Sequence, residues 1–102
     1  MTTTSEPVEA FKALADPTRL RILAMLKGKG RSCCALIDRR EPGLCACDIQ
    51  DQVGLSQSVI HHHMQLLVRA GLVASEKRGR WVYYRRNEEA IAALANTVAR
   101  AV

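Results

Sequence analysis

The stretch of sequence that decides the fold is VGLSQSVIHHHMQLLVRAG, residues 53–71. Gly54 marks a bend, Ser56 is placed to cap the helix that follows it, and Gly71 is placed to end that helix. Apolar residues also recur at helical spacing just upstream, over residues 46–53. A helix over about residues 46–52, a short turn and a second helix from Ser56 together form a helix-turn-helix.

The residues after Gly71 change from helical to alternating spacing. LVASE (residues 72–76) and WVYYR (residues 81–85) are typical strands, and KRGR between them is a hairpin turn. Helices are also predicted over residues 8–15, from Asp16-Pro17 to Gly28, and from Glu88 onward. The expected fold is mainly α with a β-hairpin: a winged helix-turn-helix of about five helices and a two-stranded wing, in one domain over residues 1–102.

The charge distribution favours a polyanionic partner. The chain of 102 residues carries 15 Lys and Arg against 10 Asp and Glu, a net charge of +5. Between Gln52 and Asn87 the only acidic residue is Glu76. Such a polarised basic region is typical of a protein that binds double-stranded DNA.

Other features exclude a membrane protein and an enzyme. No apolar run approaches the roughly 18 residues needed to cross a bilayer, and residues 1–7 lack the segments of a secretory signal. We therefore expect a cytoplasmic protein without a membrane partner, whose four cysteines are reduced thiols. The chain has no Cys-x-x-Cys pair, βαβ pattern or anion-binding loop, so we expect no enzymatic activity.

The second helix of the motif supplies the candidate base contacts. Its small polar side chains can enter a major groove, and basic residues of the hairpin can reach phosphates or a minor groove. The predicted DNA-binding residues are Ser56, Gln57, Ser58, His61, His62, Gln65, Lys77, Arg78 and Arg80. Three consecutive histidines point in three directions, so at least one faces the core or the preceding helix, and the run cannot converge on one ion.

The aromatic residues beside the hairpin have two possible roles. Trp81, Tyr83 and Tyr84 can stack on bases, or their rings can pack against the hydrophobic core. Because the side chains of a strand alternate between its two faces, we favour packing in the core.

Three segments resemble the ArsR/SmtB family of metal-sensing repressors: FKALADPTRLRIL (residues 11–23), LSQSVIHHHMQLL (residues 55–67) and GRWVYYR (residues 79–85). The resemblance covers about residues 8–102, except for an insert near residues 31–43. It implies a homodimer held by the first and last helices, with two recognition helices on a palindromic operator.

LCACDI (residues 44–49) resembles the signature of the arsenite-sensing and cadmium/lead-sensing branches of that family. The resemblance implies that Cys45 and Cys47 are ligands, and thiolates select thiophilic ions. Residues at positions i and i+2 share no helix face, so the helix must begin in an unwound form for them to converge. The alternative is that both cysteines are small buried residues, but Cys45 stands beside a turn, which is a poor position for a core residue.

The sequence departs from the arsenite sensors at Gln50, where a third cysteine is expected. Cys33 and Cys34 are the remaining thiols, and we hypothesise that one or both complete the site from the insert, residues 31–44, unless the insert is only a longer loop. Three sulfurs suit arsenite or antimonite, and four suit cadmium, lead or zinc. No organic cofactor is expected, and the last helix lacks the histidines of the family's second metal site.

These observations predict a transcriptional repressor that leaves its operator when a thiophilic ion binds the cysteines at the start of the supporting helix. A coupling of about 1–3 kcal/mol is typical of such switches. The alternatives are a repressor of the same fold that responds to thiol oxidation, a winged helix that senses nothing, and a metal-buffering protein.

Overall fold

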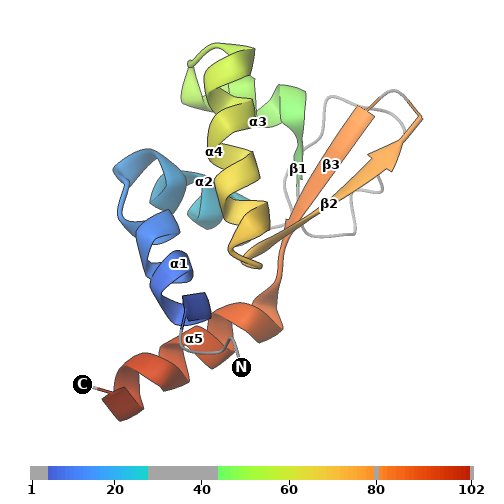
Figure 1. The fold of residues 1–102 in the computed structure, drawn as a ribbon. Coiled ribbons are helices and arrows are strands. Elements are labelled where there is room, and N and C mark those ends of the chain that lie inside the picture. The colour runs from blue at the N-terminus through green and yellow to red at the C-terminus, as the bar shows by residue number, and fades with distance from the viewer. Residues whose placement is uncertain (1–4, 28–43, 80, 102) are drawn as a thin grey trace.

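The computed structural model describes residues 5–27, 44–79 and 81–101 (Figure 1). Its elements in chain order are α1 (Ser5–Leu14), α2 (Pro17–Lys27), β1 (Leu44–Cys45), α3 (Ala46–Val53), α4 (Gln57–Arg69), β2 (Val73–Arg78), β3 (Trp81–Arg86) and α5 (Glu88–Ala101). In Figure 1, α4 lies between α1 and α2 on one side and the strands on the other, and α5 crosses below. Over these residues the predicted five helices and hairpin wing are confirmed.

Local capping signals explain where α3 and α4 begin and end. Gly54 follows α3 in the left-handed conformation, with φ 78°, and its N–H donates to the Gln50 carbonyl at 2.9 Å. Glycine adopts this conformation without steric cost. Ser56 then caps α4, because its Oγ accepts from the N–H of Val59 at 3.4 Å. The predicted turn of the helix-turn-helix is therefore present at the expected residues.

Asp16 and Asn87 begin two other helices in the same manner. The Asp16 carboxylate accepts from the Arg19 N–H at 3.1 Å, directly before Pro17 in the first position of α2. This hydrogen bond, aided by the charge of Arg19, lowers the pKa of Asp16. Asn87 Oδ1 accepts from the Ala90 N–H at 3.1 Å and so caps α5.

The wing contains one strand more than the sequence predicted. β2 and β3 pair from Val73↔Arg86 to Arg78↔Trp81, and Gly79, with φ 63°, lies in the turn that joins them. On the other edge of β3, the two-residue β1 pairs with it, so the sheet order is β1-β3-β2. This short strand shows no alternation of its own and forms only by pairing with a partner distant in sequence.

One hydrophobic core holds the helices against this sheet. α4 contributes apolar residues at positions i, i+4 and i+7, as expected for one buried helix face. The fully buried apolar side chains include Ile22, Leu26, Leu44, Ile49, Met64, Leu67 and Leu72. Among the described helices none is long and apolar enough to cross a membrane.

Candidate functional site: a thiol cluster at the start of α3

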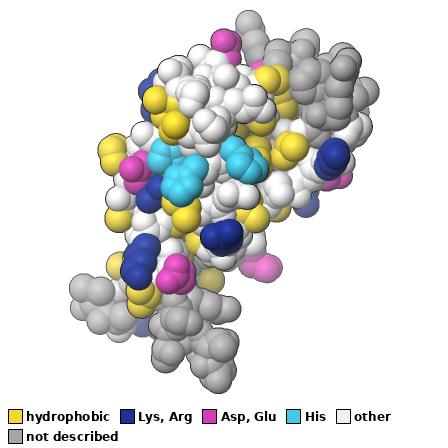
Figure 2. All heavy atoms as spheres, turned by 45° about the horizontal axis from the view of Figure 1, so that its top comes forward, with side chains coloured by type: hydrophobic (Ala, Val, Ile, Leu, Met, Phe, Trp, Pro, Cys, Tyr) yellow, Lys and Arg dark blue, Asp and Glu magenta, His cyan; other side chains and the backbone are white. Residues whose placement is uncertain are grey.

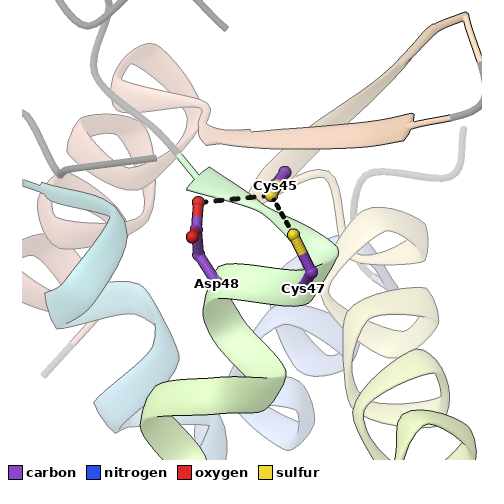
Figure 3. A group of neighbouring side chains, drawn as sticks. All are labelled: Cys45, Cys47 and Asp48. Atoms are coloured by element: carbon purple, nitrogen blue, oxygen red, sulfur yellow. Dashed lines mark hydrogen bonds between the residues drawn. The ribbon is translucent and has the colours of Figure 1, made fainter. Parts of the chain in front are cut away.

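The structure brings Cys45, Cys47 and Asp48 together where β1 becomes α3 (Figure 3). The Sγ atoms of Cys45 and Cys47 lie 2.7 Å apart, and Sγ of Cys45 donates to Oδ2 of Asp48 at 3.2 Å. One potential ligand atom from each residue lies within 4.8 Å of the other two. Two sulfurs and one carboxylate oxygen therefore converge on a volume the size of a single ion.

The backbone at Cys45 explains how residues at positions i and i+2 can meet. Cys45 is the N-cap of α3 and has an extended conformation, with φ −81° and ψ 163°, whereas Cys47 already lies in the first helical turn. The change from strand to helix turns both side chains to the same side. Cys45 precedes the helix, so no part of α3 has to unwind for the two sulfurs to meet.

The expectation that Cys45 is a poor core residue was wrong. Its side chain is fully buried, and it packs with Tyr83 and Cys47 in a small cluster beside the main core. The cause is β1, which pairs Cys45 with Tyr83 and so places the cysteine beneath the wing. Burial and ligation are compatible here, because Cys47 is only partly buried.

Cys47 gives the cluster an opening to solvent. It lines an open hollow together with Gln50, Asp51, Gly54 and Leu55, at the end of α3 that faces the turn. Gln50, which occupies the position of the expected third cysteine, thus lies beside the cluster but offers no sulfur. A small inducer can approach Cys47 from this side.

The structure describes two of the four predicted cysteine ligands, and it adds one candidate ligand that the sequence analysis missed. Cys33 and Cys34 lie outside the described residues, as does most of the insert. Asp48 was not predicted, although it follows Cys45 by three residues and such a spacing at a helix start brings two side chains together. It is the only charged side chain among the buried described residues, with 7% of its surface exposed.

The exposed face of α4 carries the predicted base-contacting residues. Side chains of Ser56, Gln57, Ser58, His61, His62 and Gln65 are all exposed. Figure 2 shows the histidine side chains at the surface beside Lys and Arg side chains. An amino-terminal helix end with small polar residues on its open face is suited to a major groove.

His63 is the histidine that turns away from this face, as expected for one of three consecutive residues. Its ring is partly buried, and Nδ1 lies 3.1 Å from Nη1 of Arg19 in α2. Arg19 also donates from Nε to the Ala13 carbonyl at 2.5 Å, so one side chain joins α1, α2 and α4.

The structure describes only some of the DNA-binding residues predicted in the hairpin wing. Lys77 is exposed on β2, opposite Val82. Arg80, and the side chain of Arg78, lie outside what the structure describes. Tyr83 and Tyr84 are buried, which confirms packing in the core over base stacking for these two rings, and burial raises the pKa of Tyr84.

The fold and the exposed helix define a winged helix-turn-helix protein of the DNA-binding class. A model of the helix-turn-helix domain family matches residues 14–76. The chain belongs to the ArsR family of winged-helix transcriptional repressors.

Three proteins illustrate this relationship. The uncharacterised HTH-type transcriptional regulator YbzH of Bacillus subtilis is 41% identical over 93 residues, which is 89% of this chain and 93% of the relative. The arsenical resistance operon repressor of Escherichia coli is 38% identical over 78% of this chain and 57% of its own length. The solved structure of an ArsR-like transcriptional regulator from Rhodococcus sp. RHA1 superposes with a TM-score of 0.75 and 29% sequence identity. The match covers 98% of this chain and 82% of the Rhodococcus chain.

Proposed function

We propose that this repressor releases its operator when arsenite or antimonite binds Cys45 and Cys47. The observation that carries the proposal is the convergence of two cysteine sulfurs and the Asp48 carboxylate at the start of α3. Trivalent arsenic and antimony bind thiolate sulfur, and a third sulfur from Cys33 or Cys34 would complete a trigonal set. The similarity to an arsenical resistance repressor supports the same inducer class.

The position of the cluster suggests how binding would reach the DNA. α3 contacts α4, which carries the candidate base contacts, and Cys45 is paired with Tyr83 of β3 in the wing. A change in the β1–α3 junction therefore acts on both DNA-contacting elements at once. Cys45 donates a hydrogen bond to Asp48 that a bound ion would replace, so ion binding would require these two side chains to change position.

We further propose that the protein acts as a homodimer on a palindromic operator. Phe11 of α1 and Val98 of α5 are 40% exposed, and Val8 of α1 is 49% exposed. α1 and α5 contact each other at one end of the molecule (Figure 1), so we expect these exposed side chains to contribute to one apolar surface there. Burying this surface in a second copy would present two α4 helices to successive major grooves.

The structure shows which cysteine variant is the better test. Cys45 is fully buried and packs with Tyr83, so Cys45→Ser puts a smaller atom in a packed position and risks a loss of stability. Cys47 is partly buried, so Cys47→Ser removes one sulfur with little other effect. Release of a fluorescent operator duplex is then measured against arsenite, antimonite, cadmium, lead, zinc and peroxide.

Arsenite and antimonite are expected to release the wild-type protein, and Cys47→Ser is expected to bind DNA normally without release. Release by peroxide alone would instead indicate a thiol-oxidation sensor, and release by cadmium, lead or zinc alone would indicate a divalent-ion sensor. The Cys33→Ser/Cys34→Ser variant tests the insert: retained release would remove both residues from the site.

A further inference from the structure

The first turn of α4 presents an apolar side chain among polar ones. Val59 is 41% exposed, although the helix buries its apolar face through Ile60, Met64 and Leu67. One of its neighbours on the helix surface is His62, three residues on. A β-branched residue in a helix has a lower helix propensity than alanine.

Val59 is also held in a defined position. Its N–H donates to Ser56 Oγ, the capping hydrogen bond that fixes the first turn, and Ser56 Oγ lies 3.4 Å from Ser58 Oγ. A valine in a helix strongly prefers one χ1 rotamer. The directions of the two methyl groups are therefore fixed, and little side-chain entropy is lost when they contact a partner.

The chemistry of the major groove offers one apolar partner for such a side chain. Each base edge there displays hydrogen-bond donors and acceptors, and thymine alone adds a C5-methyl group. The polar side chains of Ser56, Gln57 and Ser58 can pair with donors and acceptors, but the Val59 methyl groups cannot.

We propose that Val59 is a specificity-determining residue that contacts a thymine C5-methyl group in each half of the operator. The proposal rests on the placement of α4 in the major groove. It is independent of the inducer, because Val59 is not part of the thiol cluster.

The test deletes the methyl group from the DNA and from the protein separately. Duplexes bound by the wild-type protein are selected from a random library, and each thymine is replaced in turn by deoxyuridine, which lacks only the C5-methyl group. Affinities for the wild type, Val59→Ala and Leu55→Ala are measured by fluorescence anisotropy. Leu55 is the matched control, because it is 36% exposed and precedes the cap of the same helix.

One thymine in each half-site is expected to show the effect. Deoxyuridine at that position weakens wild-type binding about fourfold per half-site, the value of roughly one buried methyl group. Val59→Ala is expected to bind the thymine duplex and the deoxyuridine duplex with equal affinity. Leu55→Ala is expected to bind the thymine duplex more tightly, as the wild type does.

Three results would overturn the proposal. They are a selected site without thymine, no position where deoxyuridine weakens wild-type binding, and a deoxyuridine effect that persists in Val59→Ala. Failure to select any sequence would overturn base recognition by α4 as well. Because alanine is a good helix former, Val59→Ala is expected to fold, and its circular dichroism spectrum checks this.

Discussion

Nη1 of Arg19 lies 3.1 Å from Nδ1 of His63, which joins the start of α2 to the middle of the helix that carries the candidate base contacts. The same guanidinium donates to the carbonyls of Ala13 and Lys12 at the end of α1. α1 belongs to the proposed dimer surface. Arg19 thus connects the helix of that surface to α4 through side-chain hydrogen bonds.

Replacing Arg19 should therefore cost more than replacing a neighbouring arginine. Arg19→Met is expected to lower the free energy of unfolding by about 1–3 kcal/mol, because several partly buried hydrogen bonds are lost together. Arg21→Met is the control, since Arg21 is exposed and donates one hydrogen bond to the Gln52 carbonyl. Urea unfolding measures the free energy of unfolding of both variants. An equal loss of stability in the two would show that Arg19 does not hold these helices together more than Arg21 does.

Acid should weaken the start of α2 through Asp16. Its lowered pKa means that the unfolded chain takes up this proton at a higher pH than the folded protein does. The stabilisation is present above the ordinary aspartate pKa of about 3.9 and is lost as the pH falls through the lower folded value. Asp16→Asn keeps a capping oxygen but cannot titrate. Urea unfolding at pH 5, 4 and 3 should therefore show that the variant loses less stability than the wild type as the pH falls. Identical losses would mean that Asp16 does not contribute.

Lys77 should contribute to DNA affinity through phosphate contact alone. Lys77→Ala is expected to weaken binding to all duplexes alike and to reduce the salt dependence of log K by about 1 for each bound subunit. Arg100→Ala removes one positive charge at the end of α5, far from α4 in Figure 1, and should leave the slope nearly unchanged. A change in sequence preference caused by Lys77→Ala would indicate base contact instead.

The apolar surface of α1 and α5 should hold two chains together. Val98→Glu buries an unpaired charge in that interface and is expected to weaken dimerisation by at least roughly tenfold. Ala93→Glu is the control, because Ala93 is exposed and lies away from the Ile91, Leu94 and Val98 face of α5. Light scattering during size-exclusion chromatography gives the mass of each variant, and a stable Val98→Glu dimer would place the interface elsewhere.

Features set by neighbouring residues were predictable from the sequence. Gly54 ends the first helix of the helix-turn-helix and Ser56 caps the second, through their own backbone and side-chain preferences. The alternation of apolar and polar residues after Gly71 indicates the hairpin. Conversely, β1 depends on pairing with residues that are distant in the chain, and nothing near Cys45 indicates this partner. The burial of Cys45 against Tyr83 follows from that pairing, so local spacing did not reveal it. Asp48 is different, because its spacing of three residues from Cys45 was itself a usable signal.

The same distinction explains the histidine run. Helical geometry predicted that at least one of the three rings turns away from the exposed face, but the partner of that ring is on another helix. Only the packing of α2 against α4 identifies His63 and pairs it with Arg19.

The central claim is that the thiol cluster at the start of α3 controls DNA release. Its most direct test is anisotropy of a fluorescent operator duplex bound to wild-type protein and to Cys47→Ser while arsenite is added. We predict equal affinity of both proteins without arsenite, a 5–150-fold loss for the wild type with it, and no loss for Cys47→Ser. Undiminished release of the operator by the Cys47→Ser variant would contradict the account.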